Sequence, residues 1–383
     1  MHYDLKPIQE AEIKGKKVIM RVDYDVVKDG AIKDDDRLIK SLPTIQHILD
    51  HCPKQLILIA HNGKPQDNDQ SLSLKPVQEW LEQRLGQEVG FVDDCLQITL
   101  PETPQVLLLE NLRYYPGEKN NDENFAKHLA GYADIYVGNA FATAHRAHAS
   151  MVGIPRYLPS YAGLILQQEV EMLSKVTDTP EHPFATIVGF AKISDKIEVL
   201  ETLLNKSDKL LLGGAVVFTF LKAQGYEIGK SLCEDDKLEL AQRLLNTYKE
   251  KLILPTDFTI ADSIEGDNPR TATKEQIPKD AIGLDIGPES TALFSQELQD
   301  ARTIFWNGPV GMFEKKPFDS STNDLARYLA DTDKTVIIGG GDTTKAMKNA
   351  GVYGRMTHIS TGGGASLQFI EGKELPGLKV LCR

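Results

Sequence analysis

Residues 335–344 read TVIIGGGDTT, an apolar run that ends in three glycines, an aspartate and two threonines. The run is too short for a buried helix, and its Val and Ile residues suit a strand covered on both faces. Glycines between a strand and a helix let backbone N–H groups approach a phosphate, and the helix N-terminus adds partial positive charge. This stretch therefore predicts a strand–turn–helix unit with an anion site at the turn.

Eight further apolar runs of the same kind recur along the chain. They are KVIMRV (17–22), QLILIA (55–60), VLLLE (106–110), IYVG (135–138), TIVGF (186–190), KLLLGG (209–214), KLILP (251–255) and TIFWNG (303–308). Most are separated by segments with helical spacing, such as LKPVQEWLEQRLG (74–86). Alternation of strands and helices predicts the α/β class with mostly parallel sheets.

The length indicates more than one domain. A chain of 383 residues exceeds the roughly 100–200 residues of a typical domain, and so many strands rarely share one sheet. We expect the boundary near 160–183, where a helical segment (161–176) is followed by TDTPEHP (177–183) with its two prolines. An ordinary surface loop would have the same composition.

Charge and cysteine usage narrow the possible partners and the compartment. The chain carries 43 Lys and Arg against 55 Asp and Glu, a net charge of −12, which argues against binding to nucleic acid or an anionic membrane. It shows neither an N-terminal apolar export segment nor a run long enough to span a bilayer. The cysteines form no CxxC pair, so we expect a cytoplasmic protein with reduced thiols. They are Cys52, Cys95, Cys233 and Cys382.

Polar and cationic residues follow the strands predicted in the first half. The carboxyl ends of parallel strands meet at one edge of a sheet, where ligands bind. Guanidinium groups gathered there would suit a small phosphorylated carboxylate, although each could also be a solvated surface charge. The expected cationic group is Arg37, Lys64, Arg113 and Arg146. His145 and His148 lack a third ligand for zinc, so we expect a structural or hydrogen-bonding role for both.

Glycine dominates the strand ends of the second half. Gly213 and Gly214 end one run, and a Lys-x-x-x-Lys element, Lys192 and Lys196, follows another. Asp342 is placed to hold magnesium through carboxylate oxygen. Two other motifs fail: GYEIGKS (225–231) has one residue too few between its glycines for a P-loop, and no GxGxxG follows a strand. Dinucleotide-dependent oxidation is therefore disfavoured.

Taken together, these segments resemble phosphoglycerate kinases from end to end. The resemblance implies two Rossmann-like, three-layer α/β/α domains joined by a helix and a hinge: 1–165 for phosphoglycerate and 166–365 for nucleotide, with the tail 366–383 returning to the first. It also implies a monomer that transfers a phosphoryl group reversibly between 1,3-bisphosphoglycerate and Mg-ADP, giving 3-phosphoglycerate and ATP, a step of glycolysis and gluconeogenesis. The most specific motifs are RVDYDV (21–26), ENLRYYPGE (110–118), AHRAHAS (144–150), AKISDKI (191–197), FTFLKAQGYEIGKS (218–231), DIGPES (285–290), WNGPVGMFE (306–314), IIGGGDT (337–343) and STGGGASL (360–367).

The resemblance also implies site residues for each domain. Substrate would be bound by Asp23, Asp25, Arg37, His61, Lys64, Arg113 and Arg146. The nucleotide would be bound by Gly189, Ala191, Lys192, Lys196, Gly213, Gly214, Val310, Glu314, Gly339, Gly341, Asp342 and Thr343, with the magnesium ion on Asp342. Lys192 and Arg37, with the N–H groups near Gly340 and Gly363, would stabilise the transferring phosphoryl group.

The chain departs from the family pattern at four places. Asp25 stands where the family has Asn, Lys64 where it has Arg, Gly138-Asn139 where it has Asn-Asp, and Gly189-Phe190 where it has Gly-Gly. An ionised Asp25 beside an anionic substrate should weaken binding by like-charge repulsion, so we expect an Asn there to bind more tightly. A structural role for Asp25 is the alternative.

Two other functions are compatible with parts of this pattern. A nucleotide-binding paralogue without turnover, acting as a sensor or scaffold, would not need the phosphoryl-stabilising charges of Arg37 and Lys192. A two-domain solute-binding protein would share the architecture but would need an export signal. We therefore expect an active kinase.

Overall fold

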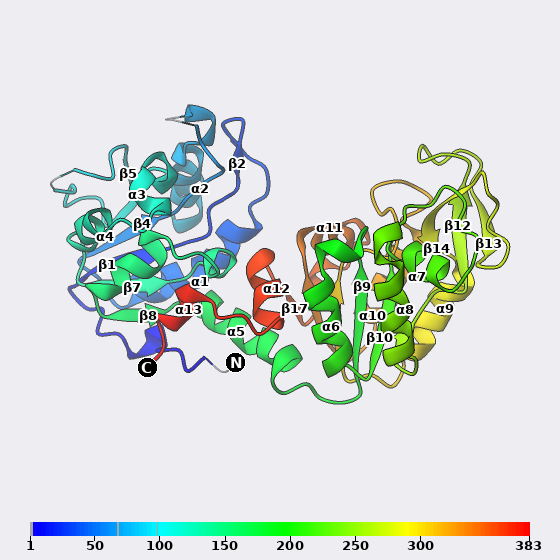
Figure 1. Cartoon of the computed structure of the whole chain (residues 1–383). Helices are drawn as coiled ribbons and strands as arrows, with labels where there is room; N and C mark the ends of the chain where they lie inside the picture. The colour runs from blue at the N-terminus through cyan, green and yellow to red at the C-terminus, as the bar shows by residue number, and fades with distance from the viewer. Residues whose placement is uncertain (1–2, 67–68, 98) are drawn as a thin grey trace. The chain divides into compact units, whose positions relative to one another are not determined.

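A computed structural model describes residues 3–66, 69–97 and 99–383. The chain forms two compact units (Figure 1). The N-terminal unit comprises the residues up to Glu171 together with Glu374–Arg383, and the C-terminal unit comprises Met172–Lys373. Each unit is built on its own sheet and has its own hydrophobic core.

A parallel sheet organises the N-terminal unit. Its strand order is β5-β6-β4-β1-β7-β8, and Met20 of β1 pairs with Leu58 on one side and Val137 on the other. The strands are β1 (Lys17–Arg21), β4 (Gln55–Ile59), β5 (Val89–Val92), β6 (Val106–Leu109), β7 (Ile135–Gly138) and β8 (Ser160–Ala162).

Helices cover this sheet because its strands are apolar on both faces. All five residues of β4 are buried. Leu56 and Leu58 share a core with side chains of α1 (Asp36–Asp50) and α2 (Lys75–Leu85), while Ile57, which alternation turns to the opposite face, is buried as well. A strand buried on both faces is the arrangement that a continuous apolar run predicts.

The C-terminal unit repeats this plan. Its parallel sheet has the order β11-β10-β9-β15-β16-β17. The strands are β9 (Phe184–Gly189), β10 (Lys209–Gly213), β11 (Leu252–Ile253), β15 (Thr303–Asn307), β16 (Thr335–Gly339) and β17 (His358–Ile359). All nine apolar runs of the sequence fall on strands of the two parallel sheets, so that prediction is confirmed.

A second, antiparallel sheet in the C-terminal unit was not predicted. It has the order β13-β12-β14, with β12 (Asp257–Ala261), β13 (Arg270–Thr273) and β14 (Ile282–Ile286). No residue of β13 is buried, so its sequence lacks the apolar run that marks the other strands. β12 and β14 carry polar residues among apolar ones and lie near the functional pocket described below.

The remaining elements cover or connect these sheets. They are β2 (Val27–Lys28), β3 (Ala31–Ile32), α3 (Pro116–Lys119), α4 (Glu123–Ala130), α6 (Ile197–Lys206), α7 (Val217–Ala223), α8 (Leu238–Thr247), α9 (Pro288–Glu297), α10 (Ser320–Ala330), α11 (Gly341–Asn349) and α12 (Gly364–Ile370). Within the described residues, no helix is both long enough and apolar enough to cross a membrane.

One helix and one tail join the units along the chain. The division after Glu171 lies inside α5 (Leu164–Thr177). The tail with α13 (Pro376–Lys379), red in Figure 1, belongs to the N-terminal unit, where Gly377 N donates to Ala144 O at 2.9 Å. Helix α12 packs on α6 and therefore belongs to the C-terminal unit, so the tail that returns to the N-terminal unit begins only at Glu374. The domain boundaries at 165 and 365 stay predictions.

Candidate active site

In the N-terminal unit, the turn after β1 is hydrogen-bonded to a loop that is distant in the sequence. The Asp23 carboxylate accepts hydrogen bonds from Ala142 N and from Thr143 Oγ1, both at 2.9 Å. The short helical turn Phe141–Thr143 follows β7, the neighbour of β1 in the sheet. Asp23 therefore holds two strand ends together, and both of its carboxylate oxygens already have protein donors.

His61 lies in the centre of this edge. Its ring is 3% exposed, and its Nδ1 contacts the guanidinium of Arg21. On the other side of the ring, Nε2 lies 3.8 Å from an Asp25 carboxylate oxygen. Burial, followed by the positive charges of Arg21, Arg113 and Arg146, lowers the pKa of His61 well below its ordinary value. His61 is therefore a neutral imidazole at neutral pH.

Asp25 is held by the turn after β4 rather than left alone. One carboxylate oxygen accepts the Gly63 N–H at 2.8 Å, and the Asp25 charge acts on the guanidinium of Arg113. The expected repulsion of an anion is thus offset by a backbone N–H and a neighbouring cation. These contacts favour the structural role for Asp25 over uncompensated repulsion.

Two arginines make the edge cationic. Arg113 is 8% exposed, and its guanidinium contacts Gly63 O. Burial, then the charge of Arg146, lowers the pKa of Arg113 to about 10, which leaves it charged at neutral pH. The buried Nε of Arg113 has no hydrogen-bond partner among the described residues. Two cations that repel each other, one with a free buried donor, form a site for an anion.

The other residues predicted for the substrate site of this unit include Arg37 and Lys64. Arg37 donates to Asp25 O at 3.5 Å, and Lys64 is exposed on the turn that holds Gly63. His145 Nε2 accepts from Arg146 Nε at 3.3 Å, while His148 lies 3.6 Å from the buried Glu118 carboxylate. The structure therefore brings Asp25, His61, Arg113 and Arg146 together, with Arg37 and Lys64 at the margin.

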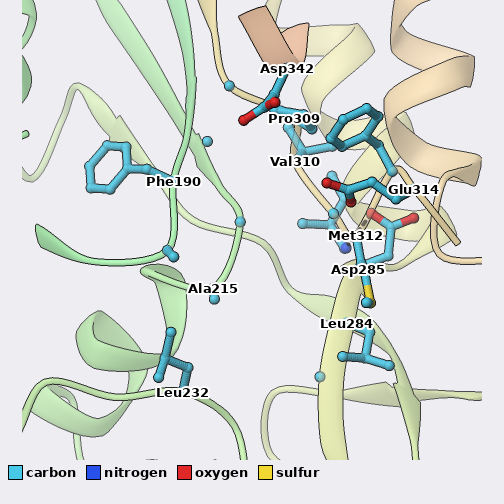
Figure 2. A pocket seen from close by; sticks show the side chains of 18 of the residues that line it. Phe190, Ala215, Leu232, Leu284, Asp285, Pro309, Val310, Met312, Glu314 and Asp342 are labelled. Atoms are coloured by element: carbon cyan, nitrogen blue, oxygen red, sulfur yellow. Dashed lines mark hydrogen bonds between the residues drawn. The ribbon is translucent and has the colours of Figure 1, made fainter. Parts of the chain in front are cut away.

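The C-terminal unit carries a pocket of about 520 Å³ at the carboxyl ends of its strands. Its lining comes mainly from the segments that follow β9, β10, β15 and β16, and from β14. Figure 2 shows the carboxylates of Asp342 and Glu314 on the same side of the pocket, with the apolar side chains of Met312 and Leu284 below them on that side. A pocket with apolar walls and few polar groups suits a small organic ligand with a charged end.

Glycine is required where these strand ends meet. Gly308 has φ +92°, and a Cβ there would lie 1.6 Å from Gly189 O. A Cβ on Gly189 would lie 1.9 Å from Pro309 O. A Cβ on Gly214 would lie 2.7 Å from Phe190 O, and a Cβ on Gly213 would lie 2.6 Å from the Val310 side chain. Backbone can approach backbone this closely only where no side chain intervenes.

Comparison with known proteins gives the family. The phosphoglycerate kinase family model matches residues 8–373. The chain belongs to the phosphoglycerate kinase family. It is 46% identical to the phosphoglycerate kinase of Dictyoglomus turgidum over 98% of this chain and 97% of that one, and 47% identical to that of Thermosynechococcus vestitus with the same coverage. The structure of the Coxiella burnetii phosphoglycerate kinase superposes with a TM-score of 0.91 at 38% identity, covering 98% of both chains.

Two Rossmann-like α/β domains are therefore the fold of this phosphoglycerate kinase family member, as predicted. The structure of the Pyrococcus horikoshii phosphoglycerate kinase also matches, with a TM-score of 0.85 and 29% identity over 98% of each chain. These matches give no support to the alternative of a non-catalytic sensor.

Most nucleotide residues inferred from the family line the pocket. Gly189, Ala191, Lys196, Gly214, Val310, Glu314, Gly341, Asp342 and Thr343 belong to its lining, as does Gly340 of the group predicted to stabilise the transferring phosphoryl. Lys196 Nζ donates to Asn307 Oδ1 at 3.0 Å, which fixes a cation beside the pocket. Gly213, Gly339, Gly363 and Lys192 are outside the lining, and Lys192 is exposed.

Thr343, which lines the pocket, also has a structural role. It is buried, and its hydroxyl accepts the Gly308 N–H at 2.7 Å while donating to Gly339 O at 2.8 Å. The hydroxyl thus ties the ends of β15 and β16 together. Its hydrogen-bonding capacity toward a ligand is mostly used by the protein.

Two residues of these sites were missed in the sequence. Arg21 is fully buried behind His61, yet in KVIMRV it stands inside an apolar run. Asp285, 4% exposed, lines the pocket of the C-terminal unit, and burial raises its pKa to about 8. A charged residue inside or beside a buried strand was the available signal, because such a residue needs a partner.

Proposed function

We propose that this chain catalyses the reversible transfer of a phosphoryl group between 1,3-bisphosphoglycerate and Mg-ADP, with 3-phosphoglycerate and ATP as products. One observation carries the proposal. A cationic group and a glycine-lined pocket lie at the strand carboxyl ends of two separate units, in a chain whose relatives are named phosphoglycerate kinase. The reaction is a phosphotransfer with a carboxyl group as acceptor.

The cationic group suits the phosphoglycerate. Electrostatic interactions link His61, Arg113 and Arg146. The buried Nε of Arg113 lacks an acceptor among the residues that the structure describes. A phosphate or carboxylate oxygen would supply that acceptor and relieve the repulsion between the arginines. Arg37 and Lys64 at the margin would complete the anion site.

The pocket suits ADP and ATP. Its apolar wall, with Leu284 and Met312, would hold the base, while Lys196 and the first N–H groups of α11 would face the phosphates. Gly340 at the start of this helix has φ +91°, so its backbone can turn without a side chain in the way. This geometry matches the strand–glycine–helix unit of the sequence.

Asp342 would hold the magnesium ion that accompanies the nucleotide. Its carboxylate is exposed at the first turn of α11 and lines the pocket, with Lys345 3.8 Å away. One carboxylate oxygen together with nucleotide phosphates is a usual ligand set for Mg²⁺, so the residues present fit the ion. Bound there, Mg²⁺ supplies charge neutralisation on the phosphate oxygens.

The transfer itself needs positioning and charge rather than a protein nucleophile. We infer that Arg37 and Lys192, with the N–H groups near Gly340 and Gly363, stabilise the phosphoryl group during its transfer. Because substrate and nucleotide bind to different units, a hinge motion would bring them into contact and exclude water from the acyl phosphate. We also propose a cytoplasmic monomer, for which the four free cysteines agree with a reducing compartment.

A coupled assay tests this function directly. Purified protein is supplied with 3-phosphoglycerate and Mg-ATP, and formation of the acyl phosphate is followed by its reduction with NADH through a dehydrogenase. Replacing Arg113 with Met should raise the KM for 3-phosphoglycerate, whereas replacing the exposed Arg156 should leave both substrates' KM values unchanged. Absence of turnover by the folded, unmodified protein would refute the proposal.

A further inference from the structure

The buried side of the substrate site contains a charged network that the proposed mechanism does not use. Arg21, at the end of β1, and Glu118, in α3, are both fully buried. Ser150 connects them: its hydroxyl accepts from Arg21 Nε at 2.9 Å and donates to the Glu118 carboxylate at 2.6 Å. A second bond runs from Ser150 N to Glu118 at 2.9 Å. Glu118 thus balances the charge of Arg21 inside the protein.

Arg21 in turn faces the imidazole of His61. One of its terminal nitrogens contacts His61 Nδ1, and the other contacts Val22 O. A guanidinium has only donors, so the nitrogen that it meets must present a lone pair. With Nδ1 an acceptor, the single proton of a neutral imidazole has to reside on Nε2. Nε2 is the nitrogen on the side of Asp25.

We propose that Arg21 is a positioning residue that holds the proton of His61 on Nε2, so that a neutral imidazole offers this N–H to the anionic substrate. The effect on substrate rests on the function proposed above, whereas the position of the proton does not. The positive charges of Arg21, Arg113 and Arg146 oppose a positive imidazole. The Asp25 oxygen, 3.8 Å from Nε2, attracts a proton on that nitrogen.

Nitrogen NMR of the ligand-free protein tests the position of the proton. With histidine labelled by ¹⁵N, and the signals assigned by their loss in His61→Gln, Nδ1 of His61 should show the shift of an unprotonated nitrogen and Nε2 that of a protonated one. Neither should titrate through neutral pH. A proton on Nδ1, or a doubly protonated ring at neutral pH, would overturn the proposal.

Substitutions test whether Arg21 itself sets the position of the His61 proton. Arg21→Met combined with Glu118→Gln removes both buried charges together, so neither is left uncompensated. In this double variant the two tautomers of His61 should mix, and the KM for 3-phosphoglycerate should rise about tenfold with the KM for nucleotide unchanged. Asp25→Asn should keep the Nε2 proton, because Arg21 is still present. The exposed Arg156→Met is the matched control.

The outcomes distinguish this inference from the proposed function. A fixed Nε2 proton in a protein without kinase activity would refute the function and leave Arg21 its role toward His61. Mixed tautomers in the unmodified protein, or an unchanged KM in a double variant whose tautomers mix, would refute this inference alone. If the double variant does not fold, the measurement on the unmodified protein decides the question.

Discussion

Among single residues, Lys192 has the most direct proposed role in the reaction. Lys192 is exposed directly before the turn Ile193–Asp195 and lies outside the pocket lining. Its charge therefore contributes little to the stability of the ligand-free protein. We expect Lys192→Ala to lower kcat by about 10²–10³-fold with little change in nucleotide Kd, since the proposed interaction with the transferring phosphoryl group would be made mainly in the transition state. Steady-state kinetics and calorimetry measure the two constants.

A lysine of similar exposure provides the control for this prediction. Lys249 is exposed in the same unit and away from the pocket, so Lys249→Ala should keep the normal kcat. A near-normal kcat for Lys192→Ala would remove Lys192 from the mechanism.

The raised pKa of Asp285 leads to a second prediction about a single residue. Burial raises its pKa from 3.8 to about 8, although Ser321 N and Ile286 N donate to its carboxylate at 3.0 and 2.9 Å. Between these two pH values the folded protein holds a proton that the unfolded chain has lost. The contribution of this group to stability is therefore present below pH 3.8 and lost as the pH rises toward 8.

The variant Asp285→Asn isolates this effect, because an amide does not titrate in that range. We expect the difference in free energy of unfolding, unmodified protein minus variant, to fall steadily as the pH rises from about 4 to about 8. Urea unfolding at several pH values measures it. A difference that is constant with pH, or that rises, would mean that Asp285 is ionised throughout.

At the scale of elements, the functional pocket depends on how closely strand ends approach. The ends of β9 and β15 meet at Gly189 and Gly308, where an added Cβ would lie within 2 Å of backbone oxygen. Gly308→Ala forces both a backbone shift and a left-handed conformation, so we expect a loss of more than about 3 kcal/mol in the free energy of unfolding. Chemical denaturation of the purified variant measures this loss.

The same substitution at an open position is the control for this prediction. Gly354 has no atom within 4 Å of an added Cβ, and Gly354→Ala should change stability by less than about 0.5 kcal/mol. Equal effects of the two substitutions would show that the close approach of β9 and β15 does not limit stability.

At the scale of the whole molecule, the distribution of the two sites over two units predicts motion. Each ligand would shift one open–closed equilibrium by its differential affinity for the closed form, and the two together would shift it further. Small-angle X-ray scattering should therefore give the smallest radius of gyration with both 3-phosphoglycerate and Mg-nucleotide bound. In Arg113→Met, 3-phosphoglycerate should lose its effect on the radius while the nucleotide keeps its own. A radius that is the same in all ligation states would contradict hinge closure.

The parallel sheets and most of the residues that line the pocket of the C-terminal unit could be predicted from the sequence alone. Apolar runs such as QLILIA (55–60) and TVIIGG (335–340) became buried strands, because a strand covered on both faces needs apolar side chains at every position. The glycines after those strands marked the pocket because backbone crowding excludes a side chain there. Both signals are local, so they can be recognised along the chain.

The partners of the charged groups could not be predicted from the sequence and became known from the three-dimensional structure. Arg21 contacts His61 and, through Ser150, Glu118, which are 40 and 97 positions away, and the Asp23 carboxylate is used by Ala142 and Thr143 rather than left for a ligand. The pKa values of His61 and Asp285 depend on burial by residues from several elements. Such properties arise from distance in space and from the exclusion of water, and neither is encoded in the spacing of residues along the chain.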